Sequence, residues 1–266
     1  MRIAPYTTYG TGNSVLFTFH GYGMDGRQFQ VLRESLCVDY QIVGFHLPYH
    51  QKGADDHEGW LKSVIETVKQ VVAEQGADHF SIAGYSIGVK VVLALLPYFD
   101  RQVKDVFLFA PYGLVRHWGI AFLESGFGRG LFRLIAGSML PIRIINGVRG
   151  LGIISYADHD ILIRELATME KRQNLRKTFL LMSELNLDQH RVLKSLSSIR
   201  GRVQLVFGKQ DNIFPLSGLK GTNELDNLDI LEVDEGHWLM TEKLDARLVA
   251  FREKILMNEY YSSIKP

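Results

Sequence analysis

The pentapeptide Gly84-Tyr85-Ser86-Ile87-Gly88 has the G-x-S-x-G pattern that places a serine on a tight turn between a strand and a helix. An apolar, strand-like run at 80–83 precedes it and an apolar, helical run at 89–96 follows it. Such a turn exposes the serine hydroxyl above the sheet, the glycines permit close backbone approach, and the helix N-terminus favours negative charge. We therefore predict that Ser86 is a nucleophile; the alternative is a structural turn serine.

A serine hydroxyl is a weak nucleophile, so it needs a base, and the base needs an acid that orients it. Of the nine histidines, His237 is the best placed, because it follows an apolar run at 228–233 and so falls at the carboxyl edge of the predicted sheet. Asp211 follows a similar run at 202–208. We predict His237 as general base and Asp211 as its acid; the alternatives are a surface histidine and a turn-forming aspartate. Two further acids, less well aimed, are Asp234 and Glu235.

A glycine-bracketed loop, His20-Gly21-Tyr22-Gly23, follows the apolar run at 14–19. A loop of this kind can present a backbone N–H to the negative oxygen of a tetrahedral intermediate. We predict the N–H groups of Tyr22 and Ile87 as the two oxyanion donors. His20 is expected to orient the loop, and it is kept as a candidate substrate contact.

Strand-like and helical runs alternate along most of the chain, which predicts an α/β fold with a mostly parallel central sheet and helices on both faces. The alternation breaks at 113–200, where the pattern is helical and Lys and Arg outnumber Asp and Glu. We predict a core domain from 1–112 and 201–266, with 113–200 inserted as a helical lid. The expected strands are 14–19, 41–47, 80–83, 103–110, 202–208 and 228–233, and the expected helices are 25–36, 58–74, 89–96 (ending before Pro97) and 242–256.

These segments, taken in order, resemble the α/β-hydrolase superfamily with an inserted cap. The resemblance covers 14–110 and 200–256 and identifies the oxyanion loop, the nucleophile turn, the acid loop and the histidine loop. It implies the α/β-hydrolase fold and a Ser-Asp-His triad, and Ser86 sets the chain apart from relatives that use aspartate as nucleophile. One departure is His46, which stands where members often carry aspartate, and this places His50 near the pocket rim as a candidate substrate contact.

Substrate choice is expected to depend on the lid, where large apolar residues between 127 and 154 are interleaved with arginines. One interpretation is simple packing on the core, with the arginines in water. A second is an apolar acyl pocket with a cationic edge formed by Arg129 and Arg133, and a third is transient contact with an anionic membrane surface. Trp238, beside the predicted base, is a further candidate substrate contact.

Composition excludes several classes of function. The formal net charge is +1, so no nucleic-acid partner is expected, and the single cysteine rules out an internal disulfide. We expect no metal, no cofactor and no stable membrane anchoring, because no metal-ligand motif, secretion signal or membrane-length apolar run is seen. The expected protein is cytoplasmic and a monomer or homodimer.

The leading hypothesis is a serine hydrolase that acts through an acyl-enzyme on a small-molecule ester or thioester with a small to medium apolar acyl group. One alternative is a carbon–carbon bond hydrolase of the meta-cleavage-product type, which would need Arg116, Arg129 or Arg133 to bind the substrate carboxylate. A second alternative is a ligand-binding protein that keeps the fold without turnover.

Overall fold

The computed structural model contains a sheet in which the strands of the described residues follow the order β1-β3-β2-β4-β5-β6-β7. β1 is antiparallel to β3, and the other neighbouring pairs are parallel. The strands are β1 (Tyr6–Tyr9), β2 (Ser14–Phe19), β3 (Tyr40–Phe45), β4 (Phe80–Tyr85), β5 (Val103–Phe109), β6 (Val203–Gly208) and β7 (Leu228–Val233). The structure describes residues 4–50, 59–99, 101–115, 125–135, 138, 140–150, 156–185, 187–222 and 225–263.

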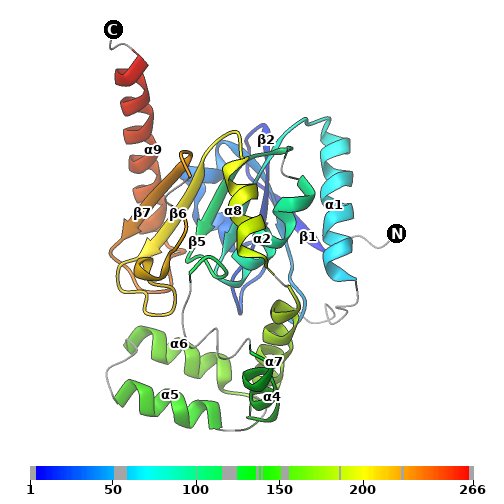
Figure 1. Cartoon of the computed structure of the whole chain (residues 1–266), viewed down its shortest axis with the longest axis vertical. Coiled ribbons are helices and arrows are strands. Elements are labelled where there is room, and N and C mark those ends of the chain that lie inside the picture. The colour runs from blue at the N-terminus through cyan, green and yellow to red at the C-terminus, as the bar shows by residue number, and fades with distance from the viewer. Residues whose placement is uncertain are drawn as a thin grey trace.

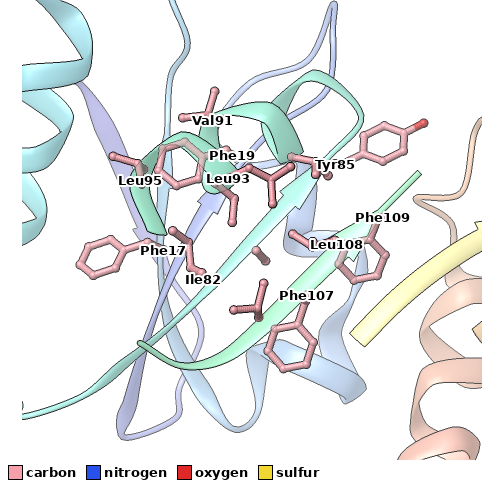
Figure 2. Close-up of a cluster of buried hydrophobic side chains, with 14 of the residues drawn as sticks. Phe17, Phe19, Ile82, Tyr85, Val91, Leu93, Leu95, Phe107, Leu108 and Phe109 are labelled. Carbon is pink, nitrogen blue, oxygen red and sulfur yellow. The ribbon is translucent and has the colours of Figure 1, made fainter. Parts of the chain in front are cut away.

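The centre of the sheet is covered on both faces. Every residue of β4 and of β6 is buried, as expected for parallel strands packed between helix layers. Figure 2 shows Phe19 of β2 and Tyr85 of β4 in one apolar cluster with Leu93 and Leu95 of α2 (Ile87–Phe99). This packing fixes the strand whose end carries Ser86.

Helices that connect or follow the strands pack around the central sheet (Figure 1). α1 spans Trp60–Gln75, and Gly76 ends it with a left-handed φ of 59°, as the sequence predicted. The predicted helix at 25–36 is wrong: it consists of a 3₁₀ turn, Gln28–Val31, and a π turn, Arg33–Cys37. The backbone of this segment is held by a residue that is distant in sequence. The Asp245 carboxylate accepts hydrogen bonds from the N–H groups of Glu34 and Ser35 at 3.0 and 2.9 Å.

Other differences from the prediction include two helix ends and one strand. α2 continues through Pro97 to Phe99, so the proline lies in the last turn and the helix ends two residues beyond it. The last helix, α9, runs from Glu242 to Ser263, and its sequence contains no Gly or Pro that would end it earlier. β1 was not predicted, because a short, half-exposed edge strand lacks an apolar pattern.

Between β5 and β6 the described chain is helical, with α4 (Gly126–Ile135), α5 (Leu140–Gly150), α6 (Tyr156–Leu166), α7 (Met169–Glu184) and α8 (Gln189–Ser197). In Figure 1, α4 to α7 form one group beyond the end of the sheet, whereas α8 lies beside α2 over the sheet. No helix in the described ranges combines the length and the apolar character that crossing a bilayer requires.

Candidate active site

Ser86 lies on a strained turn between β4 and α2. Its φ is 52°, a left-handed value that is unfavourable for a residue with a side chain. The flanking glycines are required by close packing: a Cβ on Gly88 would lie 2.0 Å from the carbonyl oxygen of Phe19, and one on Gly84 would lie 2.7 Å from the Gly88 carbonyl. The turn therefore has the geometry that the pentapeptide predicted.

The three residues predicted to act together are hydrogen-bonded in a line. Ser86 Oγ is 3.1 Å from His237 Nε2, and His237 Nδ1 is 2.9 Å from Asp211 Oδ2. All three are buried, with exposed fractions of 7%, 9% and 2% for Ser86, His237 and Asp211. These distances meet the requirement for proton transfer from the hydroxyl to an oriented imidazole.

The loops after β6 and β7 are tied together, which sets the spacing of Asp211 and His237. Gln210 N–H donates to the Glu235 carbonyl at 3.0 Å. A Cβ on Gly208 would lie 2.2 Å from the Gly236 carbonyl oxygen, so this approach requires glycine. Two loops that are distant in sequence thus act as one support.

The Asp211 carboxylate is held in its charged form. Burial alone would raise its pKa, but the hydrogen bond and the charge interaction with His237, together with two backbone N–H groups, lower the pKa below its usual value. Those N–H groups belong to Ile213 and Phe214 and donate to Oδ1 at 2.8 and 2.9 Å. Oδ2 is therefore left to orient the imidazole.

The two alternative acids are engaged elsewhere. Asp234 accepts a hydrogen bond from the Gln210 side chain at 3.1 Å, and Glu235 forms an ion pair with Lys243 at 3.4 Å. His237 is further fixed by Tyr85, whose hydroxyl donates to the His237 carbonyl at 2.8 Å and whose ring stacks on the imidazole.

The predicted oxyanion loop is anchored at several points next to Ser86. Gly21 N–H donates to Gln28 Oε1 at 2.7 Å, and the Tyr22 hydroxyl donates to the Lys171 carbonyl at 3.2 Å. Ile87 is the first residue of α2, so its N–H has no partner within the helix. Tyr22 lines the same cavity as Ser86, and the role of the Tyr22 and Ile87 N–H groups as oxyanion donors stays a prediction.

His20 supports this loop from beneath. Leu47 N–H donates to His20 Nε2 at 3.0 Å, so Nδ1 carries the proton and donates to the Gly21 carbonyl at 2.7 Å. Burial, followed by the nearby His50, lowers the pKa of His20 well below its usual value. Both ring nitrogens are used within the protein, which favours the orienting role over substrate contact.

His50 packs edge-on against the rings of His20 and Tyr22, with centroids 4.9 and 5.3 Å apart. Its Nδ1 lies 2.7 Å from the Pro48 carbonyl oxygen. Burial lowers the pKa of His50, which favours the neutral ring. His46 lies between Thr7 Oγ1 at 2.8 Å and the Gly26 N–H at 3.2 Å and so joins β1 to the loop after β2.

A cavity of about 100 Å³ opens at the serine and is mainly apolar. Tyr22 and Trp238, two of the residues predicted from sequence, line it. The residues of α6 and α7 that also line it were not predicted from the sequence, because their position depends on how these helices pack over the sheet. The described lining residues are Tyr22, Tyr85, Ser86, Glu165, Leu166, Leu175, His237 and Trp238.

Of the two arginines predicted as substrate contacts, Arg129 is not among those lining residues. Arg129 borders a second cavity of about 520 Å³ together with Lys90, Gly113 and Glu184. The side chain of Arg133 lies outside the described residues. Within the described ranges, no group of His, Cys, Asp and Glu is arranged to hold a metal ion.

Solved structures share this architecture. The α/β hydrolase MGS-M2 from a Medee basin deep-sea metagenome is 16% identical, with a TM-score of 0.63 and 94% of each chain covered. A thermophilic esterase from Thermogutta terrifontis is 14% identical, with a TM-score of 0.64 and coverage of 95% of this chain and 93% of that one. A meta-cleavage product hydrolase from Pseudomonas fluorescens IP01 is 16% identical, with a TM-score of 0.58 and coverage of 96% and 94%.

The chain therefore has the α/β-hydrolase fold, as its sequence predicted. No family model and no curated protein matches the sequence.

Proposed function

We propose that this protein is a serine hydrolase that cleaves small carboxylic esters or thioesters through an acyl-enzyme on Ser86. The observation that carries the proposal is the buried hydrogen-bonded line from Ser86 Oγ through the His237 ring to the Asp211 carboxylate. The structural neighbours include an α/β hydrolase and esterases, which supports this assignment.

In the proposed mechanism, His237 Nε2 takes the proton of Ser86 as its oxygen attacks the substrate carbonyl. The negative oxygen is stabilised by the N–H groups of Tyr22 and Ile87, and each such donor is typically worth about 3 kcal/mol in the transition state. His237 then protonates the leaving alcohol or thiol. Water, deprotonated by the same imidazole, finally releases the acid and regenerates the serine.

The cavity supports a short acyl group. Its volume of about 100 Å³ is below the roughly 300–1,000 Å³ that is usual for ligand pockets. Leu166 and Leu175, from α6 and α7, close it over the serine. We propose that α4 to α7 act as the lid, and that α8, which packs beside α2, belongs to the core.

The proposal is tested with p-nitrophenyl esters of two to twelve acyl carbons. We expect the highest kcat/KM with two to four carbons, and Ser86→Ala should lower kcat on the order of 10⁶-fold. The matched control is Ser35→Ala, because this buried hydroxyl has no hydrogen-bond partner among the described residues, and it should leave the rate unchanged. A Ser86→Ala variant that keeps more than a tenth of the activity would disprove the assignment.

A further inference from the structure

The cavity at Ser86 contains one carboxylate that the proposed mechanism does not use. Glu165, in the last turn of α6, lines it together with His237 and Trp238. Its side chain is 26% exposed. A carboxylate in a small, mainly apolar cavity acts on any charged substrate group there more strongly than it would in open water.

Glu165 is held in place through one of its two carboxylate oxygens. Oε1 forms an ion pair with Lys171 Nζ at 3.1 Å, and Lys171 Nζ also donates to the Arg164 carbonyl at 2.9 Å. Oε2 lies over the predicted oxyanion loop, because a Cβ on Gly23 would be 3.0 Å away from it. The described residues give Oε2 no hydrogen-bond donor, so it is available to a substrate.

The charge of Glu165 reaches the proposed oxyanion loop. Burial is the main cause of the raised pKa of the Tyr22 hydroxyl, and the negative charge of Glu165 adds to it. Lys171 offsets part of this charge, but it is 43% exposed and therefore only a partly effective counter-ion. The described lining of the cavity contains no Lys or Arg.

We propose that Glu165 is a specificity-determining residue that selects substrates with a cationic group beside the scissile carbonyl and rejects substrates with a carboxylate there. The inference rests on the proposed function and narrows its substrate class. The inference also disfavours a substrate of the meta-cleavage type, because the carboxylate of such a substrate would need a cation in this cavity.

Three butyryl thioesters separate charge from size at the leaving group: those of thiocholine (cationic), N-acetylcysteamine (neutral) and 3-mercaptopropionate (anionic). One thiol reagent follows all three reactions. We expect wild-type kcat/KM to be on the order of tenfold higher for the cation than for the anion. Glu165→Gln, which keeps the shape and removes the charge, should bring this ratio to about one.

Lys171→Met should have the opposite effect to Glu165→Gln, because it removes the counter-ion of Glu165 and leaves the negative charge unpaired. The cation-to-anion ratio should then rise above that of the wild type, whereas loss of lid packing would move both variants in the same direction. An equal rate for cation and anion in the wild type, an unchanged ratio in Glu165→Gln, or no rise in Lys171→Met would each overturn the inference alone. If the enzyme hydrolyses the p-nitrophenyl esters but none of the three thioesters, the inference alone is overturned; if it hydrolyses neither set, the proposed function is overturned with it.

Discussion

At the scale of single residues, the neutral state of His20 supports the proposed site. Its Nε2 accepts from Leu47 N–H and its Nδ1–H donates to the Gly21 carbonyl, so a second ring proton would break the first of these bonds. Because burial lowers the pKa of His20 well below its usual value, the folded protein keeps this ring neutral under mildly acidic conditions.

This neutrality predicts a specific dependence of stability on pH. Below a pH of about 6.5 the unfolded chain protonates His20 and the folded protein does not, so the free energy of unfolding falls as the pH falls, by up to about 1.4 kcal/mol per pH unit for one group. The free energy of unfolding, measured with urea, should depend less steeply on pH in His20→Asn. Between about pH 6.5 and 5 the slope should correspond to roughly one proton fewer taken up on unfolding. His79→Asn, at an exposed position, is the control. An unaltered slope in His20→Asn would contradict the assignment of the ring as neutral.

Residue types and local spacing predicted Ser86, Asp211 and His237, because each follows a recognisable apolar strand. Glu165 could not be predicted in this way. It is one of many acids on a helical segment, and only the packing of α6 over the strand ends brings it to the cavity. The position of Arg129 could not be predicted either. It was expected at the edge of the substrate pocket, but it borders the second cavity.

At the scale of elements, the site consists of loops that leave neighbouring parallel strands at one edge of the sheet. Such an edge collects the loops regardless of their distance in sequence. The apolar strands were therefore sufficient to predict where the candidate site lies in the fold, although the edge strand β1 and the irregular turns at 28–37 were not predicted. The turns depend on Asp245, more than two hundred residues away, which no local pattern reveals.

A substitution in the predicted oxyanion loop tests whether the arrangement of these elements supports catalysis. A Cβ on Gly21 would lie 2.6 Å from the Tyr85 ring, and that ring cannot easily move because its hydroxyl is bonded to the His237 carbonyl. Gly21→Ala should displace the loop and lower kcat by about 10²–10³-fold, as loss of an oxyanion donor does. Gly126→Ala, where a Cβ meets nothing within 4 Å, is the control and should keep the wild-type kcat. Full activity in Gly21→Ala would show that this loop does not bind the oxyanion.

At the scale of the whole molecule, the core and the helices between β5 and β6 contribute different parts of the proposed enzyme. The core brings together the predicted nucleophile, base and acid, and α6 and α7 provide the cover of the cavity. The fold could be predicted from strand and helix alternation. The separate placement of α8 and of the α4 to α7 group could not, because all are helical segments and no local pattern shows which element each one packs against.

The most direct measurement is covalent labelling of the folded protein with a fluorophosphonate, followed by mass analysis of its peptides. The account predicts one modified residue, Ser86, with labelling abolished by urea. Asp211→Asn, which can still accept the N–H groups of Ile213 and Phe214 but no longer orients the charged imidazole, should label about 10³–10⁴-fold more slowly. Labelling at another residue, or an Asp211→Asn variant that reacts at the wild-type rate, would contradict the account.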